Sequence, residues 1–138
     1  MDHYFTDNRH LAENRKEISF RFWCFNVSFI TDNGVFSKDS VDFGTRVLLN
    51  TLHEHEEELG NQLLDMGCGY GVVGIVTKKA WPDKQVEMVD VNPRAVELAR
   101  DNAEKIILRQ TFMYPMYMSR KLGILLLISL TKSSDSCR

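Results

Sequence analysis

The stretch Leu63-Leu64-Asp65-Met66-Gly67-Cys68-Gly69-Tyr70-Gly71 decides the fold. It is typical of a short apolar strand that ends in an acid and runs into a glycine-rich turn. A helical pattern follows over residues 72–80, and a second strand over residues 85–90 ends in another acid, Asp90. A strand, a glycine-rich turn, a helix and a strand with a terminal carboxylate form the first half of a nucleotide-cofactor domain.

The turn has the chemistry of a ligand-binding loop. Glycine has no Cβ, so Gly67, Gly69 and Gly71 can take positive φ and let the backbone approach a ligand closely. The helix after the turn presents free N–H groups at its start. Asp90 lies about 20 residues beyond the turn, where a carboxylate on the neighbouring strand can accept hydrogen bonds from ribose hydroxyls.

Two cofactor classes fit these residues. Residues 69–74 match G-x-G-x-x-G literally, so a dinucleotide such as NAD is one candidate. Asp65 favours the other candidate, because a carboxylate just before the glycines would oppose a pyrophosphate at the helix N-terminus. The same carboxylate suits S-adenosylmethionine, which has an ammonium and a sulfonium at one end and a ribose for Asp90 at the other.

A family resemblance supports the second candidate. Asp65-x-Gly67-x-Gly69-x-Gly71, followed by Val89-Asp90-Val91-Asn92, resembles the class I S-adenosylmethionine-dependent methyltransferases. More narrowly, the chain resembles the "methyltransferase small" domain family, which includes the bacterial enzymes that methylate guanine N2 in small-subunit ribosomal RNA. The further stretches that carry the likeness are residues 3–6, 34–38, 41–46 and 88–92. The likeness runs from about residue 3 to about residue 105.

The resemblance implies a cofactor, a partner and a set of binding residues. The cofactor is S-adenosyl-L-methionine, and the partner is ribosomal RNA or the small ribosomal subunit. The expected cofactor-binding residues are Asp65, Gly67, Cys68, Gly69, Gly71, Asp90, Val91 and Asn92. Asp65 would hold the methionine end and Asp90 the ribose. Methyl transfer needs mainly in-line positioning of acceptor and sulfonium, so no residue is assigned as catalytic.

The predicted fold class is α/β, a partial Rossmann-like class I methyltransferase sheet with an N-terminal β-hairpin. We expect a single domain over residues 1–138: an arm and hairpin over 1–40, a cofactor-binding half over 41–105 and a divergent tail over 106–138. Alternation over residues 18–31 predicts the hairpin, with Phe20, Phe22 and Cys24 on one face.

Two core elements are expected between the hairpin and the turn. The strand at 63–66 reads as a central strand buried on both faces. A helix beginning near Asp42 and ending at Gly60 should bury a stripe formed by Val47, Leu48 and Leu52.

The tail departs from the family. In members of the family, this region carries an Asn-Pro-Pro-aromatic or similar segment that holds the acceptor base. In this chain no asparagine follows Asn102, and the last proline is Pro115. We hypothesise that residues after about 105 are an out-of-frame or spliced replacement. The resemblance implies an S-adenosylmethionine-dependent methyltransferase that acts on guanine N2 of ribosomal RNA, and one that is inactive if the absent acceptor segment is essential. The alternatives are a non-catalytic or truncated cofactor-binding fragment and, less favoured, an NAD-dependent enzyme. Unpaired strand edges in a partial sheet would favour self-association.

Composition bears on whether the protein binds RNA, holds a metal or disulfides, or spans a membrane. A net charge of −2, from 17 basic and 19 acidic residues, gives no general polyanion-binding surface, so RNA binding would need a local patch. Three cysteines without a C-x-x-C pair argue against a zinc site or disulfide scaffold and favour a reducing, cytoplasmic location. His53 and His55 would point apart on a helix, so no metal is expected. The apolar stretch 122–130 is too short to span a membrane as a helix.

Overall fold

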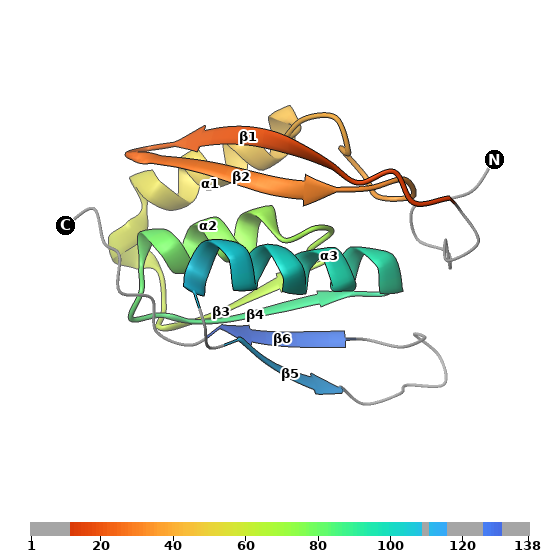
Figure 1. Cartoon of the computed structure of the whole chain (residues 1–138). Coiled ribbons are helices and arrows are strands. Elements are labelled where there is room, and N and C mark those ends of the chain that lie inside the picture. The colour runs from red at the N-terminus through yellow and green to blue at the C-terminus, as the bar shows by residue number, and fades with distance from the viewer. Residues whose placement is uncertain (1–11, 109–110, 116–125, 131–138) are drawn as a thin grey trace.

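A computed structural model describes residues 12–108, 111–115 and 126–130 of the protein. Figure 1 shows a hairpin on one side, helices in the middle and a four-stranded sheet on the other side. In chain order the elements are β1 (Lys16–Phe22), β2 (Phe25–Thr31), α1 (Phe43–Glu54), the 3-10 turn η1 (Glu56–Glu58), β3 (Gln62–Met66), α2 (Val72–Ala80), β4 (Gln85–Asp90), α3 (Pro93–Ala103), the π-helical turn η2 (Glu104–Leu108), β5 (Thr111–Pro115) and β6 (Leu126–Leu130). The predicted α/β class, with a partial class I sheet and an N-terminal hairpin, is confirmed.

The hairpin covers the helices through one apolar face. β1 and β2 pair antiparallel, with Phe22 opposite Phe25. Alternate side chains of both strands are buried: Ile18, Phe20, Phe22, Phe25, Val27 and Phe29. The prediction was wrong at Cys24, which is exposed because the chain reverses at Trp23, where φ is 49°.

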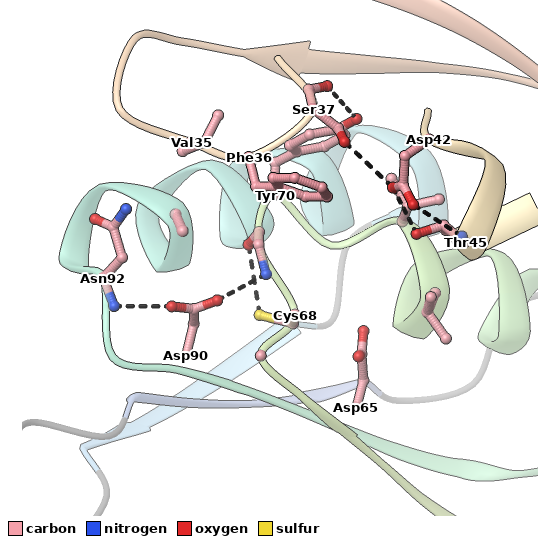
Figure 2. A pocket seen from close by; sticks show the side chains of 15 residues that line it. Val35, Phe36, Ser37, Asp42, Thr45, Asp65, Cys68, Tyr70, Asp90 and Asn92 are labelled. Carbon is pink, nitrogen blue, oxygen red and sulfur yellow. Dashed lines mark hydrogen bonds between the residues drawn. The ribbon is translucent and has the colours of Figure 1, made fainter. Parts of the chain in front are cut away.

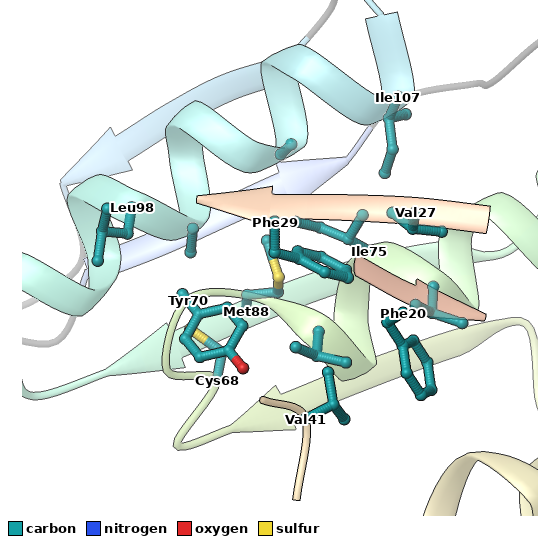
Figure 3. Packing of buried hydrophobic residues seen from close by; sticks show 14 of the residues in the cluster. Phe20, Val27, Phe29, Val41, Cys68, Tyr70, Ile75, Met88, Leu98 and Ile107 are labelled. Carbon is teal, nitrogen blue, oxygen red and sulfur yellow. The ribbon is translucent and has the colours of Figure 1, made fainter. Parts of the chain in front are cut away.

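The core lies between the hairpin and the sheet (Figure 3). Phe29 of β2, Ile75 of α2 and Met88 of β4 are fully buried there, each at 0% exposure. Leu98 of α3 is buried in the same cluster. The helices α2 and α3 therefore bury apolar side chains on two sides, against the hairpin and against the sheet.

The sheet has the order β3-β4-β6-β5. β3 and β4 are parallel, as a strand-helix-strand unit requires, whereas β6 is antiparallel to both β4 and β5. β3 is thus an edge strand within the described part of the chain, and the expected central strand buried on both faces is wrong. Leu64 is 55% exposed and Met66 is 73% exposed.

The helix boundaries follow local chemistry. α1 begins after Asp42, whose carboxylate accepts a hydrogen bond from Thr45 N at 3.0 Å. It ends at Glu54 rather than Gly60, and the expected stripe is wrong, because Leu49 is buried while Val47 and Leu48 are exposed. α2 has the predicted bounds.

The described part of the tail contains the end of η2 and the two strands β5 and β6. Part of the apolar stretch at 122–130 is strand β6, and the rest of that stretch lies outside the described residues. Across the described part of the chain, no helix has the length and apolar character needed to cross a membrane.

Candidate cofactor site

A pocket of about 330 Å³ opens where β3 and β4 end (Figure 2). One wall is the loop formed by residues 35–37, together with the start of α1. The opposite wall is the glycine-rich turn, and Asp90 and Asn92 close the end after β4. The site lies at the carboxyl ends of parallel strands, where open α/β sheets bind their ligands.

Asp65 is the last but one residue of β3, and its carboxylate faces the pocket. Its Oδ2 accepts a hydrogen bond from Gly74 N, in the first turn of α2, at 2.9 Å. Burial, together with the charge of Asp90, raises the pKa of Asp65 to about 6, even though the Gly74 hydrogen bond lowers it. A carboxylate thus already occupies the helix N-terminus at which a pyrophosphate would bind.

Asp90, at the end of β4, braces the turn. Its Oδ2 accepts a hydrogen bond from Gly69 N at 2.8 Å, and its Oδ1 accepts one from Asn92 N at 2.8 Å. A carboxylate oxygen has two lone pairs, so both oxygens keep an acceptor position for a ligand. Sequence reasoning did not anticipate this bracing role, although it placed Asp65 and Asp90 at one hollow, and both line the pocket.

The glycines of this region divide into two pairs. A Cβ on Gly67 or Gly69 would meet nothing within 4 Å, and both residues have positive φ (73° and 56°). A Cβ on Gly71 would lie 2.7 Å from Ile75 Cδ1, and one on Gly74 would overlap the Met88 side chain. The first pair leaves room on the pocket side, whereas the second pair lets α2 pack closely on its neighbours.

Asp42 is a third carboxylate in the pocket, and the sequence prediction missed it. Besides capping α1, it accepts hydrogen bonds from Thr45 Oγ1 at 2.8 Å and Ser37 Oγ at 3.2 Å. Burial alone would raise the pKa of Asp42, but the hydrogen bonds from Thr45 and Ser37 outweigh it and hold the pKa below its ordinary value. The Asp-x-x-Thr spacing of a helix cap was the available signal.

Of the other four predicted site residues, two line the pocket and two do not. Cys68 lines the pocket as a buried free thiol. Burial, reinforced by the charges of Asp65 and Asp90, raises the pKa of Cys68 well above its usual range, so it is not an activated nucleophile. Asn92 lines the pocket and caps α3, accepting from Arg94 N at 3.1 Å. Gly71 and Val91 do not line the pocket.

Phe36 also lines the pocket and is 57% exposed, so it is not a simple core residue. The two histidines of the described part of the chain, His53 and His55, do not line this pocket. His53 contacts the rings of Phe22 and Trp23, and His55 pairs with Glu58. No cluster of three His, Cys, Asp or Glu side chains suited to a metal ion occurs among the described residues.

The comparisons with known proteins agree with this geometry. The family model of the methyltransferase small domain matches residues 26–121. The chain belongs to the methyltransferase small domain family. The match continues past Lys105 to residue 121, so the expectation that the likeness ends near Lys105 was wrong.

Individual relatives fall in the same family. The chain is 42% identical over 104 residues to the uncharacterized protein YbxB of Bacillus subtilis (strain 168), covering 75% of this chain and 51% of that protein. It is 46% identical over 78 residues to ribosomal RNA small subunit methyltransferase C of Hahella chejuensis, covering 56% of this chain and 22% of that enzyme. It is 33% identical over 86 residues to ribosomal RNA large subunit methyltransferase G of Shewanella loihica, covering 62% and 21%. The chain thus matches about half of YbxB, and 22% and 21% of the two ribosomal RNA methyltransferases.

Proposed function

We propose that the pocket binds S-adenosyl-L-methionine. One observation carries the proposal: Asp42, Asp65 and Asp90 line the pocket, and no lysine or arginine is among its described lining residues. Such a site attracts a cationic ligand and opposes a pyrophosphate, because like charges held close together in a partly buried site repel. The charge pattern favours a methyl donor over NAD, despite the literal G-x-G-x-x-G at residues 69–74.

The residues present fit this cofactor. Asp65 would pair with the ammonium of the methionine end, and Gly67 and Gly69 would leave room for the ligand against the turn. Asp90 would accept hydrogen bonds from the ribose while it continues to hold Gly69 N. Cys68 and Asn92 would form the wall between these two ends. Bound there, S-adenosylmethionine would supply a methyl group from its sulfonium.

We propose that the reaction for which this cofactor site is built takes ribosomal RNA as the substrate class and a guanine N2 amino group as the acceptor. The names of the ribosomal RNA methyltransferases among the relatives support the RNA substrate. No Asn-Pro-Pro segment occurs in these 138 residues to hold the amine. We therefore expect this chain to bind the cofactor without methylating RNA. We propose that it is located in the cytoplasm, where ribosomal subunits reside. We also propose that it self-associates.

Calorimetric titration tests the cofactor. S-adenosylhomocysteine and S-adenosylmethionine should bind the wild-type chain, and NAD should not. Asp65→Asn should weaken S-adenosylmethionine binding by about 30-fold or more, since truncating one partner of a desolvated charge pair costs about 2–5 kcal/mol. Asp83→Asn is the matched control at an exposed position and should bind like the wild type. Binding of NAD alone would establish the dinucleotide alternative, and binding of no ligand would leave a non-binding fragment.

A separate assay tests whether this chain methylates ribosomal RNA. The chain is incubated with tritiated S-adenosylmethionine and small ribosomal subunits, and label in the RNA is counted against a no-protein control. We expect label at the control level, because the acceptor motif is absent. Label above that level would show an acceptor site elsewhere in the chain.

A further inference from the structure

Asn102 is a buried polar residue that the proposed function does not use. It lies in the last turn of α3, has 0% exposure and does not line the pocket. Its Oδ1 accepts from Ile30 N at 2.7 Å, and its Nδ2 donates to Ile30 O at 3.0 Å. Nδ2 also donates to Tyr70 O at 2.9 Å, so both amide hydrogens are used. One side chain thus joins the end of the hairpin to the glycine-rich turn.

Tyr70 is held at both ends. Asn102 binds its carbonyl, and its buried phenol donates to Ser37 O at 3.0 Å (Figure 2). Ser37 is one of two described non-glycine residues with positive φ, at 56°, and its Oγ donates to Asp42 at 3.2 Å. A line of hydrogen bonds therefore runs from α3 through the turn to the opposite wall of the pocket.

We infer that Asn102 is a positioning residue that acts through Tyr70 to set the separation between the two walls of the pocket. The walls are the glycine-rich turn and the loop at residues 35–37. Neither the turn nor the loop at residues 35–37 is part of a helix or strand, so their separation depends on such contacts. A position in sparsely populated φ/ψ space persists only where its surroundings hold it, as the Tyr70 and Asp42 contacts do at Ser37. The inference rests on the proposed function for its ligand, but the position of the walls can be measured without one.

The first test compares two buried residues of α3. Asn102→Ala removes the side-chain hydrogen bonds to Ile30 and Tyr70. Leu98→Ala removes a buried side chain one turn earlier that does not line the pocket. Both variants are studied at a temperature where circular dichroism shows them folded. The Kd for S-adenosylhomocysteine should rise about tenfold in Asn102→Ala, equivalent to one lost hydrogen bond of about 1.4 kcal/mol, and less than twofold in Leu98→Ala. Equal Kd values for the two variants would overturn the inference.

A double-mutant cycle tests the route. Tyr70→Phe deletes only the hydroxyl that binds Ser37 and should also raise the Kd, by about fivefold. If Asn102 acts through Tyr70, the double variant Asn102→Ala/Tyr70→Phe should bind only as weakly as Asn102→Ala alone. Additive losses would mean that the two residues act separately, which contradicts the inference.

A measurement without ligand separates this inference from the proposed function. In amide NMR spectra of the free chain, the signals of Phe36 and Ser37 should move in Asn102→Ala and Tyr70→Phe but not in Leu98→Ala. If wild type binds no S-adenosylhomocysteine and these shifts appear, the proposed function fails while the positioning role stands. If Asn102→Ala does not fold, Tyr70→Phe provides the comparison. Unmoved Phe36 and Ser37 signals would overturn the inference.

Discussion

The two faces of the β3–β4 pair differ sharply. On the helix-covered face, Met88 is fully buried under α2, and Gly74 leaves no space for a Cβ. On the other face, Leu64 and Met66 are 55% and 73% exposed. Figure 1 shows helices on only one side of this sheet. One face of the sheet is thus part of a closely packed core, and the other is an exposed apolar surface. The pocket lies at the carboxyl ends of β3 and β4. Packing on one face is enough to place Asp65 and Asp90.

The largest expected effect compares two methionines on opposite faces. Met88→Ala should lower the free energy of unfolding by about 3 kcal/mol, because it removes a fully buried side chain from a close-packed core. Met66→Ala is the same chemical change at an exposed site and should cost less than about 0.5 kcal/mol. Urea unfolding followed by circular dichroism measures both. A comparable loss at Met66 would show that the open face is covered.

A second comparison uses two glycines. Gly74→Ala should lower the free energy of unfolding by about 2 kcal/mol, since its Cβ would overlap Met88 and crowd Asp65 Oδ2 at 3.3 Å. Gly60→Ala meets nothing within 4 Å and should change stability by less than about 0.5 kcal/mol. Thermal unfolding distinguishes the two. Equal stability of the two variants would contradict the close packing of α2 on β4.

The pKa of Asp65 predicts opposite pH trends for stability and binding. The folded chain holds this proton more tightly than the unfolded chain, with a pKa near 6 against 3.8. Lowering the pH from 7 to 5 should therefore raise the free energy of unfolding, by about 1 kcal/mol once solvent screening of this partly exposed group is allowed for. Binding of S-adenosylmethionine should weaken over the same range, because the proposed pairing with the ammonium requires Asp65 to be ionised.

Asp65→Asn is the control for both trends, which should disappear in that variant. The lowered pKa of Asp42 contributes stability that is lost only as the pH falls below about 3.8, so it lies outside this range. Stability that falls from pH 7 to 5 in the wild type but not in Asp65→Asn would contradict the environment assigned to Asp65.

The smallest expected effect on folding is at the open face. Leu64→Lys places a charge on the edge strand and should change the free energy of unfolding by less than about 0.5 kcal/mol. It should reduce concentration-dependent self-association, since charged residues block edge-to-edge pairing. Sedimentation velocity measures this, with Asn50→Lys on exposed α1 surface as the control. Unchanged association in Leu64→Lys would mean that the chains do not associate through this edge.

Much of the fold was predictable from local chemistry. The bounds of α2 and β4 and the Asn92 cap follow from apolar runs, a proline at the first helical position and capping preferences. The prediction failed where the outcome depends on a distant partner. Leu63 and Leu64 have the composition of a buried strand, but burial needs a neighbour on both sides, and sequence pattern alone does not supply one.

The site shows the same division. Asp65, Gly67, Gly69 and Asp90 were predictable because they follow directly from two strand ends. Asp42 was missed as a site residue because a helix cap reaches the pocket only through the folding of the loop before α1. Two further contacts leave no periodic signal in the sequence. The hydrogen bond from Gly69 N to Asp90 joins residues 21 apart, and the one from Asn102 to Tyr70 O joins residues 32 apart.

The most direct test of the cofactor site is an amide NMR titration of the full chain with S-adenosylmethionine. The signals of Gly67, Gly69 and Gly74 should shift with saturation, because they line the pocket or donate to Asp65 and Asp90. Signals of Val27 in the hairpin and Leu64 on the open face should stay in place. Shifts confined to the Leu64 side, or no shifts at saturating ligand, would contradict the account.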